Sequence, residues 1–175
     1  MREKQDLRLF FALWPDESVR EQIENRLRPV SLENGRPVPR HNWHMTLHFI
    51  GNTSHVEKNC LHRQAKECRA EGFDLSIDTW GYFMRPKVFW LGCEDPPPAL
   101  FDLQTDLGKK LSQCQFRPES RPYNPHVTVA RKVRQPPEPT LLLPIEWRVD
   151  RFVLVESVSV DGGVRYDVIE EYGLN

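Results

Sequence analysis

Apolar and polar residues form a strand pattern and then a helix pattern at the start of the chain. The run LRLFFALW at 7–14 is apolar and aromatic, which is typical of a buried strand. A helix is predicted to begin at Pro15, because Val19, Ile23 and Leu27 recur every four positions. The first two elements are therefore a strand and a helix.

The same succession continues toward the middle of the chain. HMTLHFIG at 44–51 alternates apolar and polar residues and ends at a Gly-Asn turn, and 55–70 has a helical pattern. FDLSIDTWGYF at 73–83 and KVFWLGC at 87–93 predict two strands. The first half thus supplies a sheet with helices beside it.

The second half of the chain resembles the first. Three prolines at 96–98 precede a helical pattern of leucines, and three strand patterns follow it. The leucines are Leu100, Leu103, Leu107 and Leu111, and the strand patterns are HVTVAR, WRVDRFVLVESVSV and VRYDVIEEYGL. We therefore predict an α+β fold with two pseudo-symmetric lobes.

A length of 175 residues suits one domain, which we expect to cover residues 1–175. The Pro-rich segment Gln135–Pro144 is interpreted as a surface loop, because about thirty residues follow it, too few for a second core. The net charge of −1 argues against a protein that coats DNA. The sequence has no apolar run of membrane-spanning length and no signal-peptide pattern, so a cytoplasmic monomer without membrane contact is expected.

The four cysteines are Cys60, Cys68, Cys93 and Cys114, and they are expected to be reduced thiols. Cys60, Cys68 and the nearby His62 lack the second ligand pair of a structural zinc site. We therefore predict no metal and no cofactor.

One short motif occurs twice. NWHMTLHFIG begins at Asn42 and NPHVTVARKV begins at Asn124, so Asn-x-His-x-Thr precedes a strand pattern in both places. Side chains two positions apart on a strand share a face, which pairs His44 with Thr46 on the polar face. The same rule pairs His126 with Thr128. If an approximate twofold axis relates the lobes, both pairs line one cleft.

On the opposite faces of these strands lie apolar residues. Met45, Leu47 and Phe49 alternate with the polar residues of the first copy, and Val127 and Val129 do so in the second. All five are expected to pack in the core.

Two imidazoles and two hydroxyls suit the hydrolysis of a cyclic phosphodiester. A neutral histidine takes a proton from attacking water, while a protonated histidine donates a proton to the departing ribose oxygen. The hydroxyls of Thr46 and Thr128 would donate to the nonbridging phosphate oxygens. A lone His-x-Thr in a strand is common, whereas two copies preceded by Asn indicate function.

At these residues the chain resembles the two-histidine phosphoesterase superfamily, and most of all the bacterial RNA 2',3'-cyclic phosphodiesterases once named 2'-5' RNA ligases. The similar stretches span nearly the whole chain: RLFFALWPDE, GRPVPRHNWHMTLHFIGN, KVFWLG, RPYNPHVTVAR, FVLVES and RYDVIEEYGL. The resemblance implies two lobes, each with an antiparallel sheet and outer helices, and an active-site cleft between them.

The resemblance also implies roles for single residues. His44 corresponds to the proton donor and His126 to the proton acceptor, with Thr46 and Thr128 on the phosphate of an RNA or nucleotide end. The ring opens by expulsion of the 3' oxygen, which leaves a 2'-phosphomonoester. Arg131 matches a phosphate-binding position, although strict alternation turns it to the core unless the strand ends or bulges there.

Other residues near the motifs have both a functional and a structural interpretation. His48 shares the nominal polar face, yet a hydrogen-bonded structural role is favoured for it. Trp43 and Tyr123 are able to stack on a base, but core packing is the commoner use. The basic run Arg131, Lys132 and Arg134 is able to attract an RNA backbone, although such runs are most often solvated surface. His41, His55 and His62 are given no role.

The sequence leaves three alternatives open. The same cleft would serve reversible 2'-5' ligation of RNA ends, hydrolysis of small cyclic nucleotides, or binding of a nucleotide phosphate without turnover. Retention of both histidines and both threonines favours catalysis.

Overall fold

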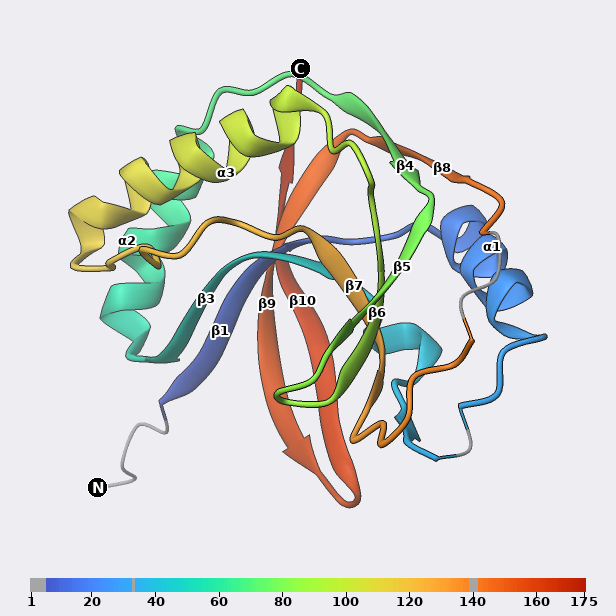
Figure 1. Cartoon of the computed structure of the whole chain (residues 1–175). Coiled ribbons are helices and arrows are strands. Elements are labelled where there is room, and N and C mark those ends of the chain that lie inside the picture. Colours follow the sequence, from blue (N-terminus) through green and yellow to red (C-terminus); the bar gives the residue numbers. More distant parts are fainter. Residues whose placement is uncertain (1–5, 33, 139–141) are drawn as a thin grey trace.

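An eight-stranded antiparallel sheet forms the centre of the computed structural model (Figure 1). The model describes residues 6–32, 34–138 and 142–175. The strand order is β10-β9-β1-β3-β7-β6-β5, and β2 pairs with β7. These strands are β1 (Leu7–Leu13), β2 (Arg36–Pro37), β3 (Met45–Thr53), β5 (Thr79–Phe83), β6 (Val88–Gly92), β7 (His126–Arg131), β9 (Arg151–Val160) and β10 (Gly163–Gly173).

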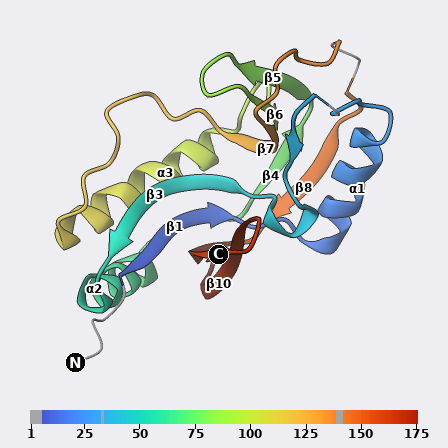
Figure 2. The ribbon, with the colours of Figure 1, turned by 90° about the horizontal axis from the view of Figure 1, so that it is seen from below.

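The two motif strands lie side by side in the middle of this sheet. β3 and β7 pair through Met45 and Val127, each of which follows a motif histidine directly. β1, β9 and β10 extend the sheet on the β3 side, and β6 and β5 extend it on the β7 side. The predicted α+β class with antiparallel strands is therefore confirmed, and the two halves of the sheet meet at the motifs (Figure 2).

Two predicted strands are each divided into two. The stretch 73–83 forms β4 (Phe73–Ile77) and β5, and the stretch 147–160 contributes to β8 (Ile145–Val149) and β9. β4 and β8 pair in a separate two-stranded sheet. Hydrophobic patterning alone does not show these breaks, because apolar residues continue on both sides of them.

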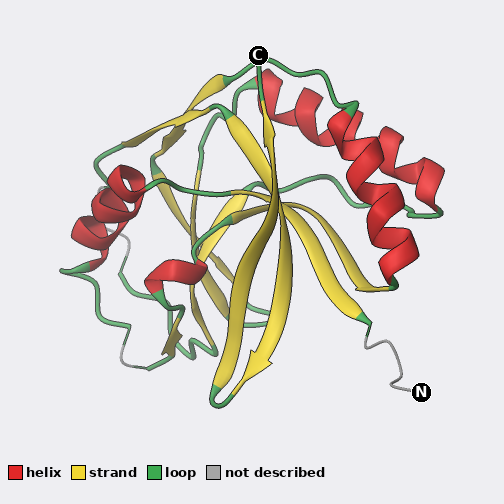
Figure 3. Ribbon diagram, turned by 180° about the vertical axis from the view of Figure 1, so that it is seen from behind, coloured by secondary structure: helices red, strands yellow, loops and turns green. Residues whose placement is uncertain are grey.

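In the described residues, three α-helices lie outside the strands, with two short 3-10 helices (Figure 3). α2 and α3 lie side by side, and α1 lies beside β8. The helices are α1 (Glu17–Leu27), α2 (His55–Lys66) and α3 (Pro98–Leu111), and the 3-10 helices are η1 (Arg40–Asn42) and η2 (Ser112–Cys114). No helix in the described ranges is long and apolar enough to cross a membrane.

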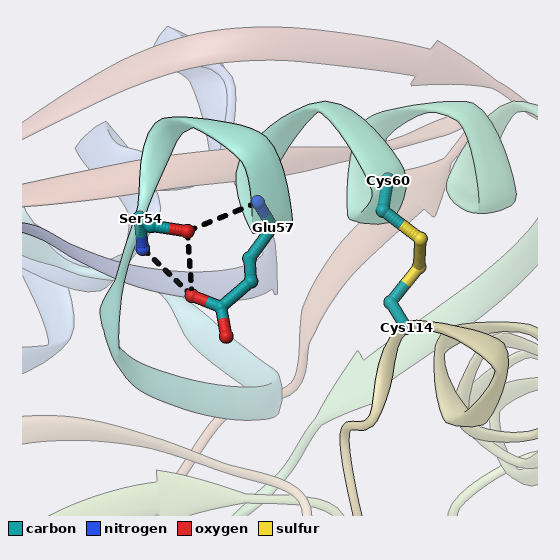
Figure 4. The surroundings of a disulfide bond; sticks show 4 residues. All are labelled: Ser54, Glu57, Cys60 and Cys114. Atoms are coloured by element: carbon teal, nitrogen blue, oxygen red, sulfur yellow. Dashed lines mark hydrogen bonds between the residues drawn. A yellow bond between two sulfur atoms is a disulfide. The ribbon is translucent and has the colours of Figure 1, made fainter.

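Local chemistry fixes where the helices begin. The Asp16 carboxylate accepts from the Val19 backbone N–H at 2.9 Å and caps α1. Ser54 and Glu57 form a reciprocal capping box at the start of α2 (Figure 4). α2 ends at Lys66, earlier than the predicted residue 70.

The main core lies between the sheet and the helices. Leu9, Phe11 and Leu13 of β1 are fully buried there, as are the four leucines predicted for α3. A smaller apolar cluster covers the opposite face of the sheet. Its buried members are Phe10, Ala12, Val153 and Val155, and Trp14, Tyr166 and Val168 pack against them.

A β-bulge interrupts the alternation of β3 after the first motif. Phe11 pairs with His48 while Ala12 pairs with Thr46, so the intervening Leu47 has no partner on β1. His48 is consequently buried, and the Phe49 side chain is 50% exposed. The prediction that Phe49 packs in the core is therefore wrong, because it assumed uninterrupted alternation. Met45 and Leu47 are buried as predicted.

β7 contains an equivalent bulge after the second motif. Phe89 pairs with Ala130 while Trp90 pairs with Thr128, which leaves Val129 as the extra residue. Arg131 is exposed as a result. The bulge that its proposed role requires is thus present in the structure.

β3 does not stop at the predicted Gly-Asn turn. It continues to Thr53, and Gly51 takes a left-handed conformation (φ 87°) at a second irregularity between β3 and β1. The predicted loop Gln135–Pro144 contains no helix or strand in its described part, and its residues 139–141 lie outside the described residues.

A disulfide joins Cys60 of α2 to Cys114 of η2 (Figure 4). Their Cα atoms are 5.8 Å apart although 54 residues separate them in the chain. The expectation of four reduced thiols is wrong for this pair, because the packing of α2 against α3 is not visible in cysteine spacing. Cys68 and Cys93 are free thiols.

Candidate active site

Both motif histidines are oriented by the backbone of the asparagine two residues earlier. His44 Nδ1 lies 2.7 Å from the Asn42 carbonyl oxygen, and His126 Nδ1 lies 2.8 Å from the Asn124 carbonyl oxygen. A carbonyl oxygen only accepts, so Nδ1 carries the hydrogen in each imidazole. The Nε2 atom of each neutral ring therefore carries a lone pair that is able to accept a hydrogen bond or a proton.

Thr46 is hydrogen-bonded to the first histidine. Its hydroxyl oxygen lies 3.0 Å from His44 Nε2, and the hydroxyl is the donor when the ring is neutral. The Tyr123 hydroxyl donates to the Thr46 carbonyl at 2.7 Å. This bond ties the segment before the second motif to the strand of the first.

The Asn42 side chain fastens the first motif to β10. Its amide nitrogen donates to the Val164 carbonyl at 3.0 Å, and its amide oxygen accepts from the Tyr166 N–H at 3.3 Å. Asn42 is buried, with 2% exposure. The Asn42 side-chain amide thus bonds to the β10 backbone as a neighbouring strand would, and these bonds hold Tyr166 beside His44.

Aromatic rings surround the His44 imidazole. The centroids of Phe10, Trp14 and Tyr166 lie 4.7, 6.0 and 5.2 Å from the His44 centroid. Burial lowers the pKa of His44 to about 4, against the opposite effect of its hydrogen bond to Asn42, and the positive charge of Arg131 lowers it further. His44 is therefore neutral at pH 7 while the cleft is empty.

His126 has a similar environment on β7. Phe83 and Trp90 lie with ring centroids 5.2 and 5.8 Å from its own. Burial lowers the pKa of His126, and the charge of Arg131 lowers it as well. Arg131 thus acts electrostatically on both imidazoles, and His126 itself lowers the pKa of His44. The three side chains belong to one electrostatic site.

A cavity of about 480 Å³ is lined by His126, whereas His44, Thr128 and Arg131 are not among its lining residues. We call it the inner cavity, and its lining includes Thr46, Phe49, Arg85, Phe116, Tyr123 and His126. Such a volume lies in the range of small-molecule sites. Thr46 and His126 bring both motifs to its wall.

The remaining residues named from the sequence have clear positions. His48 Nε2 donates to the Gln104 carbonyl at 2.7 Å, as expected for a hydrogen-bonded histidine, and His48 also lines the inner cavity. Trp43 is 5% exposed and packs in the core. Tyr123 is partly buried at the cavity wall. Lys132 and Arg134 are exposed, like Arg131.

Several site residues are not evident from the sequence. Trp14 and Tyr166 are far from either motif in the chain, and Arg85 belongs to the turn between β5 and β6. The pairing of β1 and β10 with β9 brings Trp14 and Tyr166 to His44. In the described residues, no group of three His, Cys, Asp or Glu side chains has a metal-binding arrangement.

Comparison with known proteins places this geometry in a family. The sequence model of the 2'-5' RNA ligase superfamily matches residues 15–161. The RNA 2',3'-cyclic phosphodiesterase of Escherichia coli is 33% identical, and the match covers 95% of this chain and 96% of that protein. The protein of the same name from Thermus thermophilus is 30% identical over 96% of this chain and 90% of its own length.

Solved structures agree. E. coli LigT in its apo form superposes with a TM-score of 0.85 at 32% identity, covering 97% of this chain and 98% of that one. The crystal structure of E. coli LigT complexed with 3'-AMP gives a TM-score of 0.86 at 32% identity and covers 97% and 99%. The resemblance noted at the paired motifs is confirmed, and the chain belongs to the 2'-5' RNA ligase superfamily.

Proposed function

We propose that this protein hydrolyses 2',3'-cyclic phosphodiester ends of RNA to 2'-phosphomonoesters, with His44 and His126 as its acid/base pair. The observation that carries the proposal is the matched setting of the two imidazoles. Each holds its Nδ1 hydrogen on a backbone carbonyl and directs its Nε2 lone pair away from that anchor, and at His44 the Thr46 hydroxyl is bonded to Nε2. The names of the E. coli and Thermus relatives support the same substrate.

The reaction needs two proton transfers. Water attacks phosphorus while one imidazole Nε2 removes its proton, and the other imidazole, protonated, donates to the 3' oxygen as the P–O3' bond breaks. By the family resemblance, His126 is the acceptor and His44 the donor. Each positioned transfer accelerates the reaction by about 10² to 10⁴.

Three further side chains are assigned to the phosphate. Thr46 already donates to His44 Nε2, and a bound phosphate oxygen would compete for that hydroxyl. Thr128 has the corresponding place on β7, and the guanidinium of Arg131 supplies positive charge to both histidines' surroundings. Donors directed at nonbridging oxygens stabilise the charge of the transition state.

His44 must be protonated before it can act as the donor, and we infer that the bound substrate raises its pKa enough for this. With its pKa at about 4, His44 is neutral at pH 7 in the empty cleft. A phosphate anion beside the ring favours the imidazolium, because an opposite charge nearby raises a histidine pKa. Substrate binding would thus convert His44 into the acid.

The test is turnover of an oligoribonucleotide that ends in a 2',3'-cyclic phosphate, measured with excess chelator and with analysis of the product. We expect an unchanged rate and a 2'-phosphate. His44→Ala and His126→Ala should each remove most turnover, and the double variant should be little worse than the weaker single variant. His55→Ala, at an exposed position on α2, is the matched control. Wild-type turnover in either single variant would refute the acid/base pair.

Three related functions are separated by the same assay. A 5' hydroxyl in place of water would make a 2'-5' linkage, so ligation of RNA ends uses the same groups. Preference for a mononucleotide substrate would indicate a small-nucleotide phosphodiesterase. Analogue binding without any turnover would indicate a binding module.

A single 1–175 domain, a monomeric state, the absence of a metal or cofactor, and a cytoplasmic location complete the proposal. The cytoplasmic part conflicts with the Cys60–Cys114 disulfide, because disulfides rarely persist in reducing compartments. Thiol alkylation of the protein in intact cells tests the location. Reduced Cys60 and Cys114 would fit the cytoplasm, and a disulfide between them would contradict it.

A further inference from the structure

Phe49 and Arg131 occupy equivalent places in the two motifs. Each lies three residues after the motif threonine, and each follows a bulge that leaves one residue unpaired. The bulges expose both side chains, at the end of the strand segment that carries the His/Thr pair. In the second motif this place holds a cation that acts on both histidines, whereas in the first it holds a phenyl ring.

The Phe49 ring lies where two hollows meet. It lines the inner cavity and also a second hollow of about 420 Å³, and Phe116 lines both as well. We call the second one the outer hollow, and its lining includes Phe49, Asn52, Glu57, Gln115, Phe116 and Arg117. Two aromatic residues therefore lie between the cavity that His126 lines and the outer hollow.

Two arginines and one carboxylate lie in or beside the outer hollow. The Arg8 guanidinium carbon lies 5.1 Å from the Phe49 ring centroid, and Arg117 lines the hollow itself. The carboxylate of Glu57 is engaged by the Ser54 N–H and hydroxyl in the capping box. Glu57 keeps its negative charge, and these hydrogen bonds hold its carboxylate at the start of α2.

The inner cavity has charges of both signs. Arg85 and Arg121 line it together with Glu119, and Glu119 lies 3.6 Å from the Arg121 guanidinium. This ion pair leaves Arg85 as the uncompensated charge among these three. The charge is thus net positive at both hollows, with Arg8 and Arg117 against Glu57 at the outer hollow and Arg85 uncompensated by the lining residues of the inner cavity.

We propose that the outer hollow binds the nucleotide on the 5' side of the cyclic-phosphate nucleotide, and that Phe49 stacks on its base. This inference rests on the proposed function, because it takes the strand end to lie at the histidines. The two hollows share Phe49 and Phe116 in their linings, the half-exposed Phe49 ring supplies a stacking surface, and Arg8 beside that ring and Arg117 in the outer hollow supply positive charge. Aromatic rings with interspersed cations are the usual platform for single-stranded nucleic acid.

The test compares two substrates. One is adenosine 2',3'-cyclic phosphate, and the other is an adenylyl-adenosine dinucleotide with the same cyclic end. The wild-type protein should favour the dinucleotide in kcat/KM by roughly 5- to 150-fold, the range of stacking on one aromatic side chain. Phe49→Leu should bring this preference close to one, and Phe49→Tyr, which retains the ring, should preserve it.

Val56→Ala is the matched control, because Val56 is an exposed apolar residue of α2 outside the lining of both hollows. It should leave the dinucleotide preference at the wild-type value. Thermal unfolding of each variant checks its fold, and Arg117→Gln provides a second variant, whose dinucleotide KM should rise and lose part of its salt dependence.

The outcomes separate this inference from the proposed function. No turnover of either substrate by the wild-type protein would overturn the proposed function itself. Equal kcat/KM for both substrates would leave the phosphodiesterase standing and overturn the outer subsite. A dinucleotide preference that persists in Phe49→Leu would likewise overturn the role of the ring.

Discussion

The protonation of His44 should depend on an anion in the cleft. Without one, burial among Phe10, Trp14 and Tyr166 lowers the pKa of His44 to about 4. Sulfate has no titrating proton near pH 7, and it resembles the phosphate in its tetrahedral shape and in the sign of its charge. Adding sulfate should therefore raise the pKa of His44 toward neutrality.

The size of the effect follows from Coulomb's law. One negative charge about 4 Å from the imidazolium stabilises it by about 4 kcal/mol at an effective dielectric constant of about 20. This energy corresponds to roughly a thousandfold change in the protonation equilibrium. An anion at this distance would therefore offset most of the lowering of the His44 pKa that burial causes.

The assay is an NMR titration of the histidine ring protons, with and without saturating sulfate. His44→Phe assigns the His44 signal by its disappearance, and the phenyl ring suits the aromatic surroundings. In sulfate-free protein the signal should titrate well below the ordinary histidine range. A His44 that titrates near 6.5 without sulfate would refute the burial argument, and a pKa unmoved by saturating sulfate would refute the anion's place beside it.

Three further perturbations address the threonines, Arg131 and the disulfide. Thr46→Val and Thr128→Val keep the side-chain shape and remove the hydroxyl, so kcat should fall by up to about 10² to 10³ while thermal unfolding changes less; wild-type rates in both would make them mere strand formers. Arg131→Met removes a cation that lowers the pKa of both histidines. Both pKa values should rise, and the acidic limb of the kcat/KM profile should move to higher pH; an unmoved limb would contradict the electrostatic role. Cys114→Ser opens a link across 54 residues and should cost about 4 kcal/mol in urea unfolding, with no further loss on adding reductant. Unfolding at the wild-type midpoint would show that the link does not stabilise the fold.

The sequence predicts the elements of this fold well where the apolar period is regular. The leucines of α3 and the buried run of β1 have the positions that the pattern indicates. The pattern does not separate β4 from β5, or β8 from β9. Those boundaries depend on which sheet each strand joins, a tertiary preference that local apolar spacing does not encode.

The candidate site divides in the same way. His44, Thr46, His126 and Thr128 follow from the repeated motif, because side chains two apart share a face whatever the partner strand. The exposure of Phe49 and Arg131 depends on bulges, which need an unpaired residue opposite a neighbouring strand. No residue pattern in the motifs marks Leu47 or Val129 as that extra residue, so alternation predicts the wrong face beyond it.

The two bulges also explain how a nearly symmetric pair of motifs makes an asymmetric site. Up to the threonine, each copy presents an imidazole with the same Nδ1 anchor, although the Thr46 hydroxyl is bonded to His44 Nε2 in the first copy. Beyond the bulge the copies differ, because β7 presents the Arg131 cation and β3 presents the Phe49 ring. An RNA end with a cyclic phosphate has a matching asymmetry: its negative charge is on the terminal phosphate, and the flat base of the preceding nucleotide lies further along the RNA. We therefore expect the phosphate to lie toward β7 and the RNA strand to leave across β3, an orientation that the symmetric His-x-Thr pairs alone do not determine.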